Sequence, residues 1–315
     1  MITIFCTPKN FEGIFKIIQT NAIRSWRYLA EDVEIIIFGK SEGAQKIANE
    51  VSAIYYPDVK CSKNGVPLLS DLFYKANKIA SFDILLFINS DILLPKRFTS
   101  SIKNIKDKFS KFLLVGHRWN LKVENLIDFD EVSTVSSFWE TSEIKSKKCS
   151  PAAIDYFVFR KNSLKNIPDF VVGRPGYDNW LIWYARRHFI PVVDISEEII
   201  VIHQSHHYNF HNLKNNPKIF DRNKIPIDED GKSNMELHGD KVLNLLDADF
   251  LTVNGRIQKK TSKEYLYRNL GKLSIIFPEF SLFLNIYAKL YRIFFYKNIG
   301  SSIFFLIFNK NILRF

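Results

Sequence analysis

The sequence is poor in the residues that mark several protein classes. Glycine and proline together make up about 7% of its 315 residues, against roughly 12% in an average protein, which excludes collagen-like and low-complexity chains. The three cysteines, Cys6, Cys61 and Cys149, lie far apart and form no CxxC pair, so neither a disulfide framework nor a cysteine zinc site is expected. The N-terminal half also lacks GxGxxG and GxxxxGK(S/T) strings, so no dinucleotide or P-loop site is predicted.

Long apolar runs are missing as well. The longest uncharged apolar stretch is Ile303 to Phe308, whereas a membrane-spanning helix needs about 20 apolar residues. The first residues, MITIFCTPKNF, show neither the basic start nor the apolar segment of a secretory signal peptide. We therefore expect a cytoplasmic chain.

Acidic residues are scarce at the end of the chain. The net charge is +11, and residues 256–315 hold eleven Lys or Arg but only two acids, which leaves the preceding residues nearly neutral. A nucleic-acid-binding protein more often spreads a basic face over its folded domain. No nucleic-acid partner is predicted, and the basic tail needs an explanation of its own.

The pattern of apolar residues indicates an α/β fold. Short runs rich in β-branched and aromatic residues predict strands at 2–6, 34–38, 53–56, 83–88, 112–115, 155–160, 191–194 and 199–203. Apolar residues at helical spacing predict helices at 11–30, 42–51, 67–80 and 177–187. This alternation is typical of βαβ units around a parallel sheet that is covered on both faces. Residues 131–150 are predicted to form an exposed connection, and 212–240 a polar, loop-rich segment.

The string Asn89-Ser90-Asp91 directly follows the apolar strand 83–88. Polar side chains at the carboxyl end of a parallel strand lie where open α/β sheets bind ligands. A carboxylate there suits a hard divalent cation such as Mg²⁺ or Mn²⁺, which commonly bridges a protein to phosphates. The alternative is an Asx turn that merely ends the strand.

This string resembles the DxD motif of nucleotide-sugar glycosyltransferases with the GT-A fold, as found in bacterial surface-polysaccharide and O-antigen synthesis. In that family the last aspartate binds the cation that holds the sugar-nucleotide diphosphate. The resemblance covers residues 1–210 and implies a GT-A-like, Rossmann-type fold with a mixed, mostly parallel sheet flanked by helices. Its halves would be a nucleotide-binding part, 1–115, and an acceptor part, 116–210. Asn89 replaces the first acid, which weakens the predicted cation site and leaves open whether the cation is required.

The resemblance also implies a set of donor-binding residues. Some follow the first two strands or lie in the loop before helix 67–80. The others belong to the N-S-D string and to the turn at 174–176. The set is Thr7, Lys9, Gly39, Gly65, Pro67, Asn89 and Arg174. Arg174 offers a planar fork suited to phosphate. For any one of the loop residues, an ordinary turn role is the competing interpretation.

Two acids in the second half are candidates for the acceptor side. Asp178 lies in the first turn of helix 177–187, where an acid could simply complement the helix dipole or cap the helix. In inverting members of the family, an acid at a comparable place deprotonates the acceptor hydroxyl, so the resemblance implies that Asp178 is the catalytic base. Asp155 would bind the acceptor, or else only end the preceding loop.

Four of the seven histidines gather in the string IIVIHQSHHYNFH. Imidazole is a common transition-metal ligand, but the string contains no HExxH pattern and follows a strand, so a zinc hydrolase site is not predicted. The resemblance implies that His203 completes the cation site of Asp91. His206 is the second choice, and His207 and His211 are interpreted as solvated.

The last part of the chain, 256–315, is predicted to be a basic, aromatic, helical tail after a loop-rich connection at 211–255. Within 277–297, Lys289 and Arg292 fall on a polar face, and large apolar residues fill the opposite side. This profile is typical of a helix that lies in the plane of a membrane surface. We expect residues 277–315 to contact the inner face of the cytoplasmic membrane; the alternative is packing on the catalytic domain or on a partner.

These patterns predict a metal-assisted glycosyltransferase that moves a sugar from a nucleotide-sugar donor to a glycan or lipid-linked acceptor in surface-polysaccharide synthesis. Two other classes stay open. A sugar nucleotidyltransferase usually carries a glycine-rich basic loop after its first strand, which TPKNFEG does not supply. A non-enzymatic membrane-surface protein with a degenerate site is favoured by the missing acid at Asn89.

Overall fold

The computed structural model describes residues 1–206 and 227–296. By internal contacts the chain divides into two units, Met1–Lys260 and Thr261–Phe315. The first half of the first unit contains β1 (Ile2–Cys6), α1 (Gly13–Arg27), β2 (Val33–Phe38), α2 (Ala44–Glu50), β3 (Ile54–Tyr56), α3 (Leu69–Ile79), β4 (Ile84–Ile88), β5 (Ile92–Leu93), α4 (Phe98–Lys108) and β6 (Leu113–Val115). Its remainder contains β7 (Arg118–Leu121), α5 (Val132–Lys145), β8 (Lys147–Lys148), β9 (Tyr156–Arg160), α6 (Tyr177–Arg187), β10 (Val192–Asp194), β11 (Val201–Gln204), α7 (Glu229–His238), a 3-10 turn (Leu245–Asp247), β12 (Phe250–Val253) and β13 (Arg256–Lys259).

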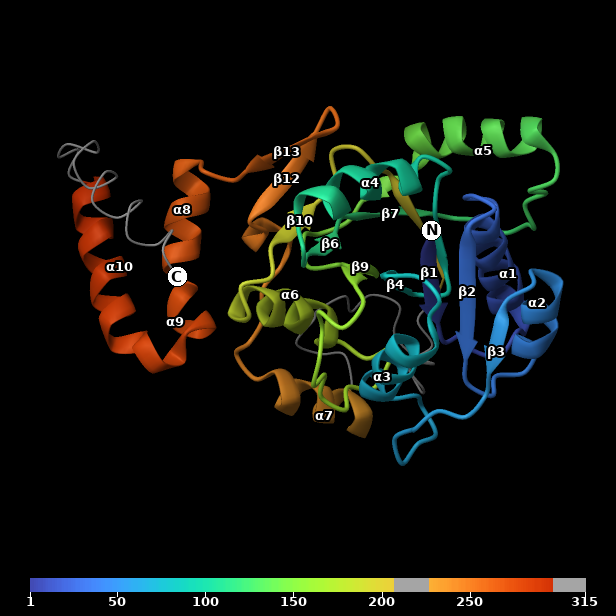
Figure 1. The fold of residues 1–315 in the computed structure, drawn as a ribbon, viewed down its shortest axis with the longest axis horizontal. Coiled ribbons are helices and arrows are strands. Elements are labelled where there is room, and N and C mark those ends of the chain that lie inside the picture. Colours follow the sequence, from blue (N-terminus) through green and yellow to red (C-terminus); the bar gives the residue numbers. More distant parts are fainter. Residues whose placement is uncertain (207–226, 297–315) are drawn as a thin grey trace, which may run out of the picture. The chain divides into compact units, whose positions relative to one another are not determined.

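Nine strands of this unit form one sheet (Figure 1) in the order β13-β12-β10-β6-β9-β4-β1-β2-β3. All neighbouring pairs run parallel except those made by β9, which is antiparallel to both β4 and β6, and the antiparallel pair of β12 and β13. The predicted mixed, mostly parallel sheet is therefore confirmed. A smaller sheet has the order β5-β11-β7-β8.

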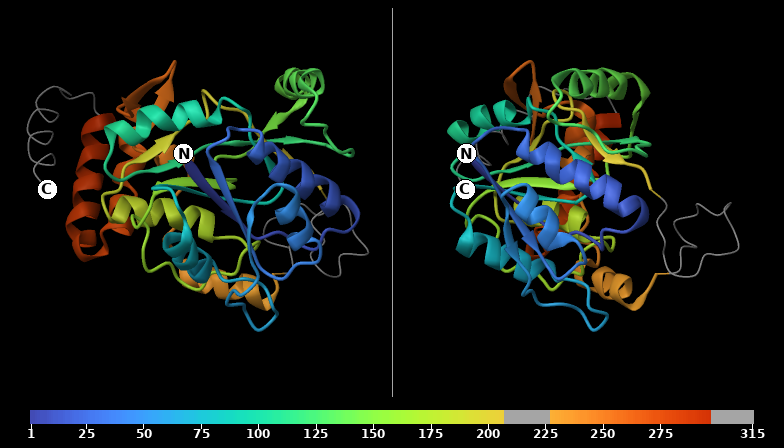
Figure 2. Two further views of the ribbon diagram at one scale, coloured as in Figure 1. Left: turned by 45° about the vertical axis from the view of Figure 1, so that its right-hand side comes forward. Right: turned by 90° about the vertical axis from the view of Figure 1, so that its right-hand side faces the viewer.

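The two faces of the large sheet are covered by different helices (Figures 1 and 2). Because side chains alternate along a strand, Ile4 and Cys6 of β1 face a core that includes Trp26 of α1 and further residues of α2 and α4. Phe5 points to the other face, where its ring lies 5.3 Å from the ring of Phe73 in α3. Burial on both sides explains why β4 is apolar throughout and β1 is apolar except at Thr3.

Most of segment 131–150 is exposed, as predicted, but an irregular connection is wrong because most of it is α5. Val135 of this helix is buried, and Phe138 and Trp139 pack against a small core formed with the second sheet. These three apolar residues, spaced like one face of a helix, are enough to hold a segment whose other residues are mainly polar.

The stretch predicted to be loop-rich between the catalytic domain and the tail also contains regular structure. Helix α7 begins after Asp228, whose side chain accepts a hydrogen bond from Gly231 N at 2.8 Å, as an N-cap residue does. Strand β12 joins the large sheet beside β10. The prediction for 212–240 is therefore wrong for α7, while residues 207–226, which include His207 and His211, lie outside the described residues.

The second unit is helical over its described part. It contains α8 (Lys263–Leu270), α9 (Leu273–Ile276), a 3-10 turn (Pro278–Phe280) and α10 (Ser281–Tyr296), so the helix predicted within 277–297 is confirmed. The apolar run Ile303 to Phe308 lies outside the described residues. Among the described helices, none is long and apolar enough to cross a membrane.

Candidate metal centre and active site

The chain reverses its direction of travel across the sheet between β1 and β4. From β1 it moves outward to β2 and β3, and it then returns to form β4 on the other side of β1. Open α/β sheets bind ligands at the carboxyl ends of the strands at such a point. Here the carboxyl end of β1 leads into the loop of Thr7 and Lys9, and that of β4 leads into Asn89 and Asp91.

Asp91, His203 and His206 converge at this point. Asp91 Oδ2 lies 3.0 Å from His206 Nε2 and 3.5 Å from His203 Nε2, and one ligand atom from each of the three residues lies within 4.8 Å of the others. Strand pairing creates this arrangement, because β11 runs antiparallel to β5 and places His203 opposite Ile92, the residue that follows Asp91. The structure thus brings together the two predicted metal ligands and also His206, the second choice for the same role.

The imidazole of His203 is held in one orientation by Asn120. The parallel register of β11 and β7 places the two residues side by side, and His203 Nδ1 donates a hydrogen bond to Asn120 Oδ1 at 2.9 Å. The ring is thereby held with Nε2 facing Asp91, and a cation would bind this nitrogen once it carries no proton. A partner on the second ring nitrogen is what orients metal-binding histidines in proteins.

The environment of Asp91 fits a divalent cation. Burial alone would raise the pKa of this carboxyl, but the charges and hydrogen bonds of His203 and His206 outweigh it and hold the pKa well below its usual range. Its Oδ1 atom is buried without a hydrogen-bond partner among the described residues, although buried carboxylate oxygens are normally satisfied. One carboxylate and two imidazole nitrogens form a donor set for a transition ion such as Mn²⁺.

Two cationic side chains adjoin this cluster. Burial lowers the pKa of the Lys9 ammonium, the charge of Asp91 opposes this effect, and the charge of Arg174 adds to it. Lys9 Nζ also lies 4.5 Å from the centre of the Phe15 ring. The predicted phosphate ligand Arg174 is bound to Asp228, with Nη2 and Oδ2 2.7 Å apart. Asp91 therefore has Lys9 as a charged neighbour, while the charge of Arg174, which acts on Lys9, is paired with Asp228.

Three of the residues predicted to bind the donor lie together, namely Thr7, Gly39 and Pro67. A Cβ atom added to Gly39, whose φ is +97°, would stand 3.1 Å from Thr7 Oγ1 and 3.8 Å from Pro67 Cγ, so the backbone at Gly39 approaches both loops closely. Gly65 lies in a separate turn, where its amide donates to Ser62 O at 3.0 Å. A Cβ at Gly65 would meet no described atom within 4 Å.

Asn89 is bound to Asp155 rather than to the metal cluster. Its side-chain amide donates to Asp155 Oδ1 at 2.8 Å, and its oxygen accepts a hydrogen bond from the Tyr177 hydroxyl at 3.2 Å. The other oxygen of Asp155 pairs with Arg118 Nη1 at 2.5 Å. Both carboxylate oxygens of Asp155 are thus held inside the protein, and its side chain is only 9% exposed.

Asp178 stands beside this network in the first turn of α6. Burial raises the pKa of its carboxyl to about 6; hydrogen bonds from backbone amides oppose this shift, and the charge of Asp155 adds to it. Gly176, the N-cap residue of α6, has a φ of +113°, and a Cβ there would lie 2.4 Å from His238 Cδ2. A carboxyl whose pKa lies near neutrality can both accept and release a proton under ordinary conditions.

The sequence did not single out Asn120, Arg118 or Tyr177. Asn120 and Arg118 become visible only in the folded chain, because each contacts a residue far from it in the sequence. Tyr177 had one available signal, its place next to Asp178 at the start of α6.

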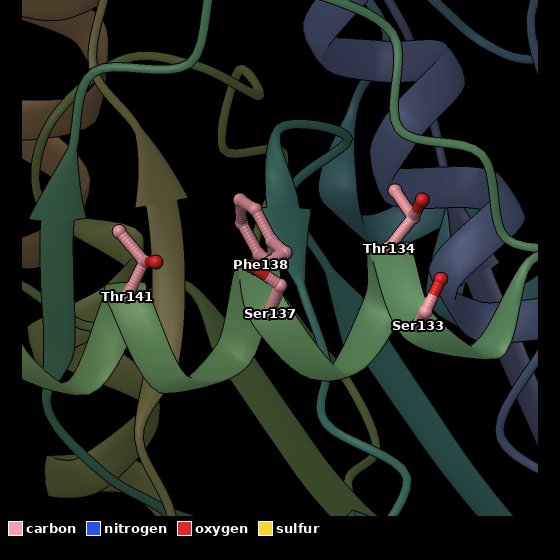
Figure 3. Close-up of a pocket in the computed structure, with 5 residues that line it drawn as sticks. All are labelled: Ser133, Thr134, Ser137, Phe138 and Thr141. Carbon is pink, nitrogen blue, oxygen red and sulfur yellow. The ribbon is translucent and has the colours of Figure 1, made fainter.

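Two hollows on the described surface are lined by residues outside the cluster. One lies along α5 (Figure 3) and is lined by Ser133, Thr134, Ser137, Phe138 and Thr141. A second is lined by residues of α3 and its neighbouring loops, including Lys60 and Asp169. Neither contains a residue that the sequence singled out.

The comparisons with known proteins gave similarities among solved structures only. No family model matches the sequence, and no curated protein matches it. A structure of S. aureus TarS residues 1–349 is 12% identical with a TM-score of 0.44, over 64% of this chain and 60% of that one. The structure of the same protein in complex with UDP-GlcNAc is 16% identical with a TM-score of 0.30, over 38% of this chain and 35% of that one. The M. tuberculosis glucosyl-3-phosphoglycerate synthase with Mg²⁺ and UDP is 15% identical with a TM-score of 0.41, over 66% of this chain and 72% of that one. This chain thus spans between about a third and three quarters of the structures it resembles.

Proposed function

We propose that this chain is a glycosyltransferase that uses a nucleotide-sugar donor. The observation that carries the proposal is the cluster of Asp91, His203 and His206 at the point where the sheet order reverses. A divalent cation held by these three residues would neutralise charge on the diphosphate leaving group. Lys9, whose pKa is affected by the charge of Asp91, supplies a second positive group for the same diphosphate. Two imidazole ligands favour Mn²⁺ over Mg²⁺ at this site.

The acceptor is proposed to bind on the side of Asp178. If the reaction inverts the sugar configuration, this carboxylate takes the proton of the attacking hydroxyl. Asn89 and Tyr177 join the N-S-D loop to the first turn of α6, so they fix the place of the base relative to the metal cluster. In this proposal the acceptor is a glycan or lipid-linked glycan of surface-polysaccharide synthesis, which matches a basic tail better than a small soluble acceptor does.

The test of this function is a thermal-shift series with UDP, GDP, CMP and TDP, each with and without Mn²⁺. A ligand that binds only the folded state adds about 2.7 kcal/mol of stability at a hundredfold excess over its Kd. We expect one diphosphate to raise the melting temperature and Mn²⁺ to enlarge the shift. No shift with any nucleotide would contradict the proposal. The sugar is then identified by testing nucleotide sugars with the matching base for hydrolysis, which is measured as release of the nucleoside diphosphate.

Replacing Asp178 by asparagine is expected to separate activity from stability. A base must be ionised, so kcat should rise with pH through about 6 in the native protein and should be at least a hundredfold lower in the variant. Because the folded state binds this proton more tightly than the unfolded state, stability falls as pH rises from about 4 to about 6.

The variant carries no such proton and should therefore melt at a higher temperature than the native protein at pH 8, but not at pH 4. Calorimetry at both pH values checks this. A variant that is inactive and also less stable at pH 8 would mean that Asp178 acts as a helix cap.

Replacing Asn120 by leucine is expected to weaken Mn²⁺ binding by about ten- to a hundredfold, because His203 loses the partner that orients its ring. Mn²⁺ binding is measured by electron paramagnetic resonance on the purified protein. The matched control is Asn104→Leu, on the exposed side of α4. Equal Mn²⁺ affinity in the native protein and Asn120→Leu would contradict a role of Asn120 in orienting a His203 ligand.

A further inference from the structure

Helix α10 uses one face for packing within its own unit, and the described residues of that unit leave another face uncovered. It contacts α8 and α9. Ala288 is buried, and burial raises the pKa of Tyr287, with the neighbouring Tyr291 adding to the shift. These three residues fall on one side of the helix at three- and four-residue spacing, which is the side turned away from solvent.

The opposite side carries a strip of large apolar side chains. Leu282, Phe283, Ile286 and Leu290 are 77%, 67%, 53% and 45% exposed. Their spacing places them along one edge of α10 over about two turns. Phe280, just before the helix, is 60% exposed as well. We call these five residues the α10 strip. Single exposed apolar residues are ordinary, but a contiguous strip of this kind marks a binding surface.

The charge of the surrounding sequence points to the occupant. Residues 256–315 carry eleven basic and two acidic side chains, and the exposed Lys289 lies directly beside the strip. Two copies that met through this surface would bring two strongly basic tails together, which like-charge repulsion opposes. An anionic lipid surface offers both an apolar layer for the strip and negative charge for the lysines and arginines.

We propose that the α10 strip binds in the plane of an anionic phospholipid surface and attaches the protein to it peripherally. The helix lies at the boundary between headgroups and acyl chains, with Phe283 and Ile286 in the apolar layer and Lys289 among the phosphates. Such a surface is provided by the inner face of a cytoplasmic membrane. This attachment is independent of the proposed transferase chemistry, because it involves none of the metal-centre residues.

Co-sedimentation of the full chain with vesicles tests the proposal. We expect binding to vesicles that mix phosphatidylcholine with phosphatidylglycerol, weaker binding as salt is raised, and little binding to phosphatidylcholine alone. Ile286→Asn should lower the partition coefficient about tenfold, and Lys289→Glu should lower it by a similar factor. The matched controls are Ile144→Asn, at a side chain 84% exposed on α5, and Lys103→Glu on α4.

Circular dichroism establishes that each variant keeps its helices. If Ile286→Asn fails to fold, Lys289→Glu decides the question alone, because an exposed charge does not enter a core. Equal binding by Lys289→Glu and the native chain would overturn the proposal, as would absence of binding to the anionic vesicles. A dimer in lipid-free solution that Ile286→Asn converts to a monomer would also overturn it, since a second copy would then cover the strip.

Discussion

The variant Asp91→Asn is expected to lose Mn²⁺ binding and to lower kcat/KM by about a thousandfold, since a metal ion supplies several kcal/mol of transition-state stabilisation and about 1.4 kcal/mol corresponds to a factor of ten. The amide keeps the shape of the side chain but removes the charge that faces His203 and His206. The Mn²⁺-dependent part of the nucleotide thermal shift should disappear with it. Titration of Mn²⁺ by electron paramagnetic resonance measures the first effect directly.

The matched control is Asp107→Asn, an exposed acid on α4, which should leave both metal binding and activity unchanged. His206→Gln separates a cluster of three ligands from one of two. If His206 is a ligand, this variant should bind Mn²⁺ at least as weakly as Asn120→Leu, which loses only a residue that orients a ligand. An Asp91→Asn variant that keeps its Mn²⁺-dependent shift would remove the cation from this site, and full activity in that variant would argue for a metal-independent reaction.

The order of strands and helices could be predicted from local patterns, because those patterns are physical consequences of burial. Strand 83–88 is apolar throughout since both of its faces are covered, and the structure forms β4 there. The helix predicted at 177–187 has the same bounds as α6. The direction of β9 has no comparable signal. It depends on the insertion of β9 between β4 and β6, which is decided by contacts between distant residues.

Polar segments were harder to predict. The sequence of α5 is dominated by serine, threonine and glutamate, which are typical of an exposed connection, and its helix depends on Val135, Phe138 and Trp139 packing on the second sheet. No property of residues 131–150 alone shows that this surface exists. A helix held by tertiary contacts in this way is what weak intrinsic propensity permits.

The site was predictable to the extent that it lies at strand ends. Asp91 and His203 each follow or end an apolar strand, and the structure brings them together. Asn120 could not be found, because its contact with His203 arises from the register of β7 and β11. The partner of Asn89 could not be found either, because it depends on the pairing of β4 with β9. The sequence shows an amide where the DxD motif has an acid, but only the structure shows Asp155 2.8 Å away.

The hydrogen bond between Asn89 and Asp155 predicts what happens when the first acid of the DxD motif is restored. Asn89→Asp recreates the DxD string, yet we expect it to destabilise the fold by about 3 kcal/mol. The amide that donates to Asp155 Oδ1 would become a second carboxylate beside a buried carboxylate, and the like charges repel where water screens them poorly. Urea unfolding measures the change as a lower midpoint at an unchanged slope. The penalty should shrink at acid pH, where protonation of the new carboxyl restores a donor.

The double variant Asn89→Asp/Asp155→Asn exchanges the two groups and supplies the internal control. It returns one amide and one carboxylate to the pair, so most of the lost stability should be recovered, and the coupling energy in the cycle should be favourable. Asn89→Ser, which removes the hydrogen bond without adding charge, should cost about 1 kcal/mol. If Asn89→Asp is instead as stable as the native protein and binds Mn²⁺ more tightly, then residue 89 is a ligand position. The hydrogen bond from Asn89 to Asp155 would then not be the reason for an amide at this position.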